Sequence, residues 1–329
     1  LKSHHASFAL GFTQSGHMKH ELRNLVCRAE MKRRIAADTT PRQTLSFYRY
    51  HPIESPEEIR DALYENFERL GVLGRVYVAR EGINAQISVP TAQLDNLRAY
   101  LNTHDFSRDV RFNFAVDDDG KSFYLLKIKA RAKIVADGIE DPDFSMEKRG
   151  QYLDAASFNA LTESGDAVLV DMRNSYEFEV GHFEGALEIP SETFREQLPR
   201  ALETLRGREK QPVVMYCTGG IRCEKASAFL RHHGFESVFH LEGGILEYVR
   251  QAQQNGLENK FRGKNFVFDE RRAENIGPET VSRCHHCAAL ADTHHNCTIA
   301  PCNRLFIGCP ACVEKFGGLC PICQRENAT

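Results

Sequence analysis

The strongest candidate for chemistry in this chain is a short cysteine loop, Cys217-Thr-Gly-Gly-Ile-Arg222. It follows an apolar run at residues 212–216 and precedes a helix-like stretch at residues 223–230. A cysteine between a buried strand and a helix start meets free backbone N–H groups and the positive end of the helix dipole, which favour the thiolate. The charge of Arg222 adds to this effect. We therefore expect a nucleophilic thiol that handles an anionic or sulfur-bearing species, in preference to a buried structural cysteine.

Seven consecutive residues form the predicted active-site loop. Cys217 is the expected nucleophile, and it is followed by Thr218, Gly219, Gly220, Ile221, Arg222 and Cys223. The two glycines allow the backbone to curl so that its N–H groups point inward. Cys223 has two open interpretations: it resolves an oxidised or persulfidated Cys217, or it is a small apolar residue of the following helix.

A second group of reactive residues lies near the carboxyl end, where eight of the eleven cysteines fall between positions 284 and 323. They form four pairs: Cys284-x2-Cys287, Cys297-x4-Cys302, Cys309-x2-Cys312 and Cys320-x2-Cys323. Each pair offers two thiolates, so the spacing predicts two sites of four cysteines with zinc as the expected metal. The segment has few large apolar residues, and we expect a structural role for the metal. An iron–sulfur cluster is the alternative.

The pairing of these cysteines stays open at this point. Sequential sites would join the first pair to the second and the third to the fourth, whereas an interleaved arrangement would join the first pair to the third. Four histidines are alternative ligands: His285, His286, His294 and His295. Contact with RNA is a secondary role for this segment.

Alternating cations mark a third candidate site. Four of them alternate with small or apolar residues, so a strand here would place them on one face along roughly 20 Å: Lys127, Lys129, Arg131 and Lys133. Such a row suits the phosphate backbone of RNA, and a solvated strand face is the alternative. The net charge of −3 provides no global basic field, so an RNA site must be a local patch of this kind.

The elements that position these residues divide the chain into five parts. We expect a flexible leader over residues 1–40, a domain over 41–137, a second domain over 150–252, a connector over 253–283 and a small metal-binding zinc-knuckle module over 284–323. The patterns of the first domain run in the order βαββαβ, which predicts a ferredoxin-like, acylphosphatase-like α+β fold. In the second domain strands and helices alternate, which predicts a parallel α/β sheet with its site at the carboxyl ends of the strands.

The cellular compartment can be inferred from the lack of membrane and secretion signals and from the distribution of the cysteines. No apolar run has transmembrane length, and the amino end lacks the features of a signal peptide. The crowded cysteines then favour metal binding in the reducing cytosol over disulfides. We expect a cytoplasmic protein without membrane contact. Residues 1–17 have the character of a disordered leader, or of translation upstream of a natural start at Met18.

The motifs around Cys217 resemble the rhodanese homology domain. They include Val168-Leu-Val-Asp-Met-Arg173, Gly181-His-Phe-Glu-Gly-Ala186 and Leu241-Glu-Gly-Gly-Ile245, in the order and spacing of that family over about residues 150–252. The resemblance implies a doubly wound α/β sheet with the active cysteine between a central strand and the next helix. It also implies that four residues brace the domain through ion pairs and hydrogen bonds: Asp171, Arg173, Glu177 and His182.

The length of the loop narrows the chemistry. Rhodanese-like phosphatases use Cys-x5-Arg, whose larger ring of amides accepts phosphate, whereas Cys217 and Arg222 stand in a Cys-x4-Arg pattern. The shorter loop better suits one sulfur atom held as a persulfide on Cys217. We therefore expect no phosphatase activity.

Across its length, from about residue 40 to 323, the chain resembles the bacterial tRNA uridine hydroxylase family. The motifs outside the rhodanese segment include Ser46-Phe-Tyr-Arg-Tyr50, Arg80-Glu-Gly-Ile-Asn84, Gly263-Lys-Asn-Phe-Val-Phe-Asp-Glu-Arg271 and the cysteine pairs. The resemblance implies an oxidoreductase that performs oxygen-dependent 5-hydroxylation of the wobble uridine of tRNA. It implies molecular oxygen as cosubstrate, the anticodon arm of tRNA as partner, and Cys217 as the essential cysteine.

Two other functions stay open. A sulfurtransferase would move persulfide sulfur from Cys217 to a tRNA or a small acceptor, and the short loop favours it locally. A non-catalytic RNA-binding module is the third interpretation, which the intact Cys217 and Arg222 disfavour. Hydroxylation with oxygen normally uses iron, copper or flavin, yet no 2-His-1-carboxylate set and no flavin or nicotinamide fingerprint is evident. Our hypothesis is that Cys217 adds to C6 of uridine and so makes C5 nucleophilic, or that it carries an oxidised or persulfide sulfur.

Overall fold

The computed structural model describes residues 26–326. The expected leader at residues 1–17 and the start at Met18 lie outside this range. Part of the range 1–40 is nevertheless a helix, α1 (Arg28–Ala37), with no buried residue. Cationic contacts hold it, because Lys32 Nζ lies 2.6 Å from Glu270 Oε2 and 5.1 Å from the ring centre of Tyr124. A sequence without an apolar face gave no reason to expect this element.

The N-terminal domain has the predicted βαββαβ order with one further strand. Its sheet has the order β4-β1-β3-β2-β5, in which β5 lies parallel to β2 at the edge and the other neighbours are antiparallel. The ferredoxin-like class is confirmed. The elements are β1 (Arg42–Tyr50), α2 (Pro56–Arg69), β2 (Leu73–Ala79), β3 (Gly82–Pro90), η1 (Thr91–Gln93), α3 (Leu94–Leu101), β4 (Asn113–Phe114) and β5 (Leu126–Ala130).

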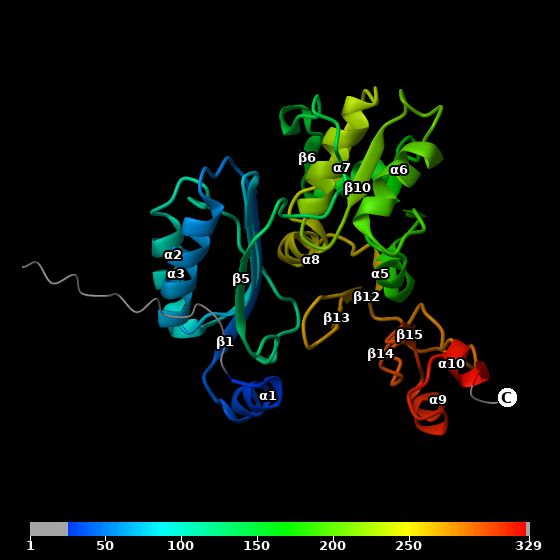
Figure 1. The fold of residues 1–329 in the computed structure, drawn as a ribbon. Helices are drawn as coiled ribbons and strands as arrows, with labels where there is room; N and C mark the ends of the chain where they lie inside the picture. The colour runs from blue at the N-terminus through cyan, green and yellow to red at the C-terminus, as the bar shows by residue number, and fades with distance from the viewer. Residues whose placement is uncertain (1–25, 327–329) are drawn as a thin grey trace, which may run out of the picture.

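The two faces of this sheet differ because apolar and polar residues alternate along β1. Leu45 and Phe47 face a core shared with helices α2 and α3, which cover the outer side of the sheet (Figure 1). Ser46 and Tyr48 lie on the opposite face, which turns toward the central domain. The helices therefore leave a polar face free to form one wall of a site.

The central domain is the predicted doubly wound α/β fold. Its five strands are all parallel in the order β6-β11-β10-β7-β9, and separate apolar cores lie on the two faces of the sheet. The elements are β6 (Gln151–Leu153), α4 (Ala155–Glu163), β7 (Val168–Asp171), α5 (Ser175–Val180), β8 (Gly181–Phe183), β9 (Leu187–Glu188), α6 (Phe194–Thr204), β10 (Val213–Tyr216), α7 (Ile221–His232), β11 (Val238–Leu241) and α8 (Gly244–Asn255), preceded by η2 (Met146–Lys148).

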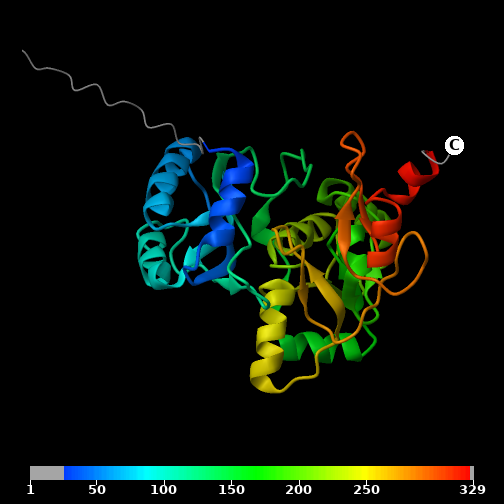
Figure 2. The same cartoon turned by 90° about the horizontal axis from the view of Figure 1, so that it is seen from below.

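The predicted connector at residues 253–283 contains two strands. Strand β12 (Phe261–Phe266) pairs with β8 of the central domain and with β13 (Ala273–Asn275). The cysteine module follows and lies beside the central domain, away from the N-terminal domain (Figure 2). Its elements are β14 (His294–Asn296), β15 (Leu305–Ile307), α9 (Pro310–Lys315) and α10 (Pro321–Glu326). Within residues 26–326, every helix is too short or too polar to cross a bilayer.

Candidate active site at the domain interface

Cys217 lies where strand β10 ends and helix α7 begins. Val213–Tyr216 is fully buried in the middle of the parallel sheet, so the chain delivers Cys217 to the carboxyl edge of the strands. Gly220 caps α7 with φ +99°, a backbone conformation that favours glycine. A Cβ there would come within 2.7 Å of the Tyr48 hydroxyl oxygen. The second glycine therefore serves the close approach of the two domains as well as the turn.

The Cys217 sulfur is buried and surrounded by donors. Its side chain is 1% exposed, and Gly220 N–H donates to Sγ over 3.2 Å. Burial opposes ionisation, but hydrogen bonding from the Cys223 side chain, the charge of Arg222 and the backbone amides of Cys223 and Gly220 together lower the Cys217 pKa to about 6. At neutral pH this pKa favours the thiolate form of Cys217.

Cys223 belongs to the site and is not merely an apolar residue of α7. It is fully buried, and its thiol donates a hydrogen bond to the Cys217 sulfur. Burial and the neighbouring Cys217 thiolate raise the Cys223 pKa well above its ordinary value. The proton of the pair thus stays on Cys223, and Cys217 carries the negative charge.

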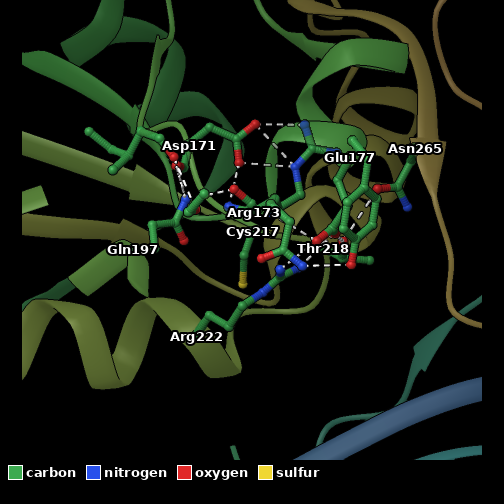
Figure 3. Close-up of polar contacts among 12 residues, drawn as sticks. Asp171, Arg173, Glu177, Gln197, Cys217, Thr218, Arg222 and Asn265 are labelled. Atoms are coloured by element: carbon green, nitrogen blue, oxygen red, sulfur yellow. Dashed lines mark hydrogen bonds and ion pairs between the residues drawn. The ribbon is translucent and has the colours of Figure 1, made fainter. Parts of the chain in front are cut away.

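Arg222 lines the pocket, and its guanidinium binds a buried carboxylate. Its Nη1 and Nη2 bind Glu177 Oε2 and Oε1 at 2.7 and 2.9 Å, and Glu177 is fully buried (Figure 3). Thr218 Oγ1 lies 3.5 Å from both Glu177 Oε1 and Asn265 Oδ1. Glu177, expected to brace the domain, therefore braces the reactive loop itself.

The remaining predicted bracing residues lie behind the loop. Arg173 is fully buried, and its Nη2 lies 2.6 Å from both Asp171 Oδ2 and the Gly181 carbonyl oxygen. Gln197 Nε2 donates to the Arg173 carbonyl over 2.6 Å, which ties α6 to the same cluster (Figure 3). His182 Nδ1 lies 2.9 Å from the Phe178 carbonyl, and its ring stacks on Phe178. His182 is outside the pocket.

A pocket of about 220 Å³ separates the Cys217 loop from the polar face of the N-terminal sheet. Most of its lining comes from three parts of the chain. The loop supplies one wall, the sheet supplies the opposite wall, and the segment after β12 closes one side with Phe268, Arg271 and Glu274. The sheet residues that face the loop carry hydroxyl and amide groups: Ser46, Tyr48, Asn84, Gln86 and Asn113.

Direct hydrogen bonds hold the two walls together. The Tyr48 hydroxyl donates to Glu224 Oε1 over 2.9 Å, and the Tyr50 hydroxyl donates to the Ile221 carbonyl over 3.2 Å. Asn113 Nδ2 donates to the Gly219 carbonyl over 3.3 Å. Each bond joins the N-terminal sheet to the first turns of α7 or to the loop, so the sheet fixes the geometry around Cys217.

A buried lysine adds an ionic lock to this interface. Lys225 Nζ lies 2.6 Å from Glu81 Oε2 and 3.3 Å from Asp137 Oδ2. The same ammonium lies 4.9 Å from the ring centre of Tyr50. Because the Lys225 side chain is only 3% exposed, the pair is shielded from solvent screening.

The basic strand is partly as predicted. Strand β5 ends at Ala130, and Lys133 binds the buried Asp137 instead of joining a row, so the four-cation row is wrong for Lys133. Lys127 and Lys129 pair with Arg75 and Tyr77 of β2, which places them on the polar face of the sheet. The charges of Lys127 and Arg131 lower the Lys129 pKa, as expected for cations that lie close together.

Cross-strand register connects this basic edge to the pocket. Asn113 opposes Ser46, Ser46 opposes Gln86, Gln86 opposes Arg75, and Arg75 opposes Lys127. Opposed residues of a sheet project from the same face. A single polar row therefore runs from Asn113 beside the Cys217 loop to Lys127 at the sheet edge.

The eight cysteines of the carboxyl-terminal module form two groups in the interleaved arrangement. Within residues 26–326 the sulfur atoms of each group lie within 4.8 Å of one another, and the groups are Cys284, Cys287, Cys309, Cys312 and Cys297, Cys302, Cys320, Cys323. The Cys287–Cys309 and Cys302–Cys320 sulfurs are 3.7 and 3.8 Å apart. Zn–S bonds of about 2.3 Å in a tetrahedron require S···S edges of about 3.8 Å, so these groups fit zinc.

The neighbouring polar groups agree with thiolate ligands. Cys320 N–H donates to Cys297 Sγ over 3.4 Å, and this bond lowers the Cys297 pKa to about 7. His285 and His286 bind Glu179 Oε1 and the Leu319 carbonyl instead of joining a cysteine group. The His285 bond to α5 also ties the module to the central domain. The two sites therefore need no histidine.

Sequence reasoning missed the whole sheet wall of the pocket. Ser46 and Tyr48 had a signal, because they alternate with the buried Leu45 and Phe47 and so predict a second, polar face. Asn113 alternates with Phe112 and Phe114 in the same way, although its strand β4 contains only two residues. That these residues meet Cys217 depends on how two domains dock, which local patterns do not contain.

Comparison with known families agrees with this architecture. Residues 42–134 match the UPF0176 acylphosphatase-like domain, residues 154–251 the rhodanese-like domain, and residues 262–325 the rhodanese C-terminal region. The fold and the cysteine loop thus define a rhodanese-domain protein whose site is completed by an acylphosphatase-like domain.

Curated relatives cover nearly the whole chain. The tRNA uridine(34) hydroxylase of Salmonella arizonae is 55% identical over 300 residues, which is 91% of this chain and 86% of that protein. The enzyme of the same name from Enterobacter sp. is 54% identical over 93% of this chain and 88% of its own length. The chain belongs to the family of these proteins. Among solved structures, the Alr3790 protein from Anabaena sp. is 25% identical over 34% of this chain and 91% of its own, with a TM-score of 0.28.

Proposed function

We propose that this protein is a tRNA-modifying oxidoreductase that hydroxylates the wobble uridine, position 34, at C5. The relatives described above are named tRNA uridine(34) hydroxylases and are 55% and 54% identical to this chain over 300 and 308 residues. The single structural observation that carries the proposal is the Cys217 thiolate at the floor of a pocket whose facing wall carries amides and hydroxyls. Such a wall suits the polar edge of a nucleobase.

Cys217 has the character required for addition to a pyrimidine. In the proposed step the thiolate forms a bond to C6, and the electrons of the C5=C6 double bond move to the C4 carbonyl as an enolate. C5 then takes an oxygen atom from an electrophilic donor. Loss of the C5 proton and of the C6–S bond restores the double bond and the thiolate. Molecular oxygen supplies the atom, two electrons from a dithiol-type reductant complete its reduction, and the second oxygen leaves as water.

The polar row of the N-terminal sheet provides a path for the tRNA. With uridine 34 in the pocket, the adjoining sugar–phosphate backbone of the anticodon arm lies toward Arg75, Lys127, Lys129 and Arg131. A row of cations binds the phosphates of RNA whatever the base sequence, while the pocket recognises the base. This placement extends the base toward Cys217 away from its neighbours, as in other enzymes that act on a nucleobase.

The remaining parts have supporting roles. Two structural zinc ions, one in each four-cysteine group, would fold the carboxyl-terminal module and hold it against α5. Because tRNA is the substrate and the cysteines require a reducing environment, the protein acts in the cytoplasm. The Glu177–Arg222 pair and the Asp171–Arg173 pair keep the loop in its thiolate-stabilising form.

The test is nucleoside mass spectrometry of tRNA from a strain that lacks this gene. The strain is complemented with the wild-type protein, with Cys217→Ser, or with Cys27→Ser as a matched control at an exposed cysteine outside the site. The proposal expects 5-oxygenated wobble uridine with the wild type and the control only. Full hydroxylation by Cys217→Ser would overturn the role of Cys217. Normal oxygenated uridine in the deletion strain together with missing thiolated uridine would assign sulfur transfer instead.

A further inference from the structure

One polar atom of the pocket has no partner. Asn113 is 4% exposed, and its Oδ1 is buried without a hydrogen bond. Several other described side chains have such atoms, but Asn113 alone among them lines the pocket that contains Cys217. A buried acceptor without a donor costs free energy, so its presence here calls for a ligand that supplies one.

The Nδ2 atom of Asn113 sets the orientation of the side-chain amide. Nδ2 donates to the Gly219 carbonyl over 3.3 Å, and a flipped amide would place two oxygen atoms against each other. The backbone is held as well, because Asn113 lies in β4 opposite Ser46. Oδ1 is therefore a preformed acceptor, and the loop of Cys217 itself holds it in place.

At ring position 3, only uracil of the two pyrimidine bases supplies the missing donor. Uracil carries N3–H, whereas N3 of cytosine is an acceptor and would oppose Oδ1 with a second lone pair. N3 and C6 are opposite vertices of the ring, so a uracil that donates from N3 can keep C6 next to Cys217. We propose that Asn113 Oδ1 accepts N3–H of the target uridine and is a specificity-determining residue. This inference rests on the proposed function and names the group that reads the base.

A purely structural role for Asn113 makes a different prediction. If the side chain only anchors the Gly219 carbonyl, its removal alters every substrate equally. If Oδ1 reads N3–H, its removal selectively abolishes the preference for bases that have this hydrogen. Two substrates that differ only at N3, each tested with the wild type and the Asn113 variant, form a double-mutant cycle. The cycle shows whether the effect of the Asn113 substitution depends on the N3 hydrogen.

The experiment compares two tRNAs that carry uridine or 3-methyluridine at position 34 and are otherwise identical. Hydroxylation by the full-length protein is followed by mass spectrometry, and kcat/KM is obtained for each tRNA. The wild type is expected to prefer uridine by at least about 10-fold, and Asn113→Ala to bring the ratio close to one. Asn66→Ala is the matched control, because Asn66 Nδ2 also binds a main-chain carbonyl but lies on α2 outside the pocket. It is expected to keep the wild-type ratio.

An unchanged ratio in Asn113→Ala would overturn the proposal. A second measurement covers a variant too slow to assay: affinities for the two tRNAs are compared in Cys217→Ser protein, with and without Asn113→Ala. The proposal expects Asn113→Ala to remove the uridine preference in binding, and a retained preference contradicts it. Failure of the wild type to hydroxylate either tRNA would instead reject the proposed function, so the two failures are distinguishable.

Discussion

The thiol of Cys223 donates a hydrogen bond to the sulfur of Cys217, and this bond helps to lower the Cys217 pKa, while burial and the same bond raise the Cys223 pKa. Cys223 therefore stabilises the charge of its neighbour, while its role in resolving an oxidised Cys217 stays a prediction. It also places a thiol in contact with any oxidised form of Cys217. A sulfenic acid formed there by a peroxide would lie next to a thiol with which it could condense to a disulfide.

The first prediction concerns the Cys217 pKa of about 6. The rate of Cys217 alkylation by iodoacetamide should rise as the pH passes about 6 and level off above pH 7, because the thiolate is the reacting form. An ordinary thiol would keep gaining reactivity up to about pH 9. Mass spectrometry of the Cys217 peptide across this range provides the profile.

Cys223→Ala should raise the Cys217 pKa, since a hydrogen bond to the charged sulfur is lost. At pH 6 alkylation then slows several-fold, while at pH 9 it is nearly unchanged. Cys27→Ala, at an exposed cysteine, should leave the profile as in the wild type. A profile that is the same in Cys223→Ala would contradict the proposed hydrogen bond.

A second prediction follows from the buried pair of Glu177 and Arg222. Glu177→Ala leaves the buried guanidinium without its carboxylate, and the free energy of unfolding should fall by about 3–5 kcal/mol. Glu184→Ala removes a carboxylate that pairs with Arg262 at the surface and should cost about 1 kcal/mol or less. Urea unfolding of the three proteins tests this, and equal midpoints for the two variants would show that the inner pair adds no stability.

The reactive loop could be predicted from the sequence because its determinants are local. Strand β10, two glycines and the start of α7 follow one another in the chain, and they place Cys217 among backbone amides without help from distant residues. The cysteine spacing likewise predicted two sites of four ligands. Interleaving of the pairs was beyond the sequence, because both arrangements satisfy the same spacings and only the fold of the module selects one.

The wall of the pocket opposite Cys217 could not be predicted from the sequence, because its position depends on contacts between residues far apart in the chain. Asn113 reaches the Gly219 carbonyl because the two domains dock against each other. The docking contacts come from Tyr48, Tyr50 and Lys225, whose residue types are also common on solvent-exposed surfaces, so the sequence does not mark them as interface residues. For Lys133, the local sequence pattern gave a wrong prediction because a distant contact decides where its side chain lies. Its alternation with Lys127 and Lys129 predicted a shared face, but the strand ends early and a buried carboxylate captures the ammonium.

A third prediction concerns metal content. The wild type should hold two zinc ions per chain, measured by mass spectrometry of metals after desalting. Cys287→Ala with Cys309→Ala damages one group and should leave one zinc, whereas Cys287→Ala with Cys297→Ala damages both and should leave none. Sequential sites would give the reverse result, so the two double variants test the interleaved pairing directly.

A fourth prediction concerns the ionic lock at the domain interface. Lys225→Met removes the cation that Glu81 and the buried Asp137 share and leaves Asp137 paired with Lys133, which should weaken domain docking by about 2 kcal/mol. We expect faster proteolysis within residues 131–149 and at least a tenfold loss of tRNA hydroxylation. Lys260→Met is the control, since Lys260 pairs with exposed carboxylates of Glu163 and Glu258. Identical cleavage rates for both variants would rule out a docking role for Lys225.

The last prediction separates the cations of the basic edge by their partners. Lys127→Gln and Lys129→Gln should each weaken tRNA binding and reduce the slope of log affinity against log salt by about one, because each removes one phosphate contact. Lys133→Gln should instead lower thermal stability and leave the salt slope unchanged, since its ammonium binds Asp137 within the protein. Lys210→Gln, at an exposed site of the central domain, provides the baseline for loss of one surface charge. Fluorescence anisotropy with labelled tRNA at several salt concentrations measures the slopes. If Lys127→Gln and Lys210→Gln have equal slopes, the row of cations does not carry the RNA backbone.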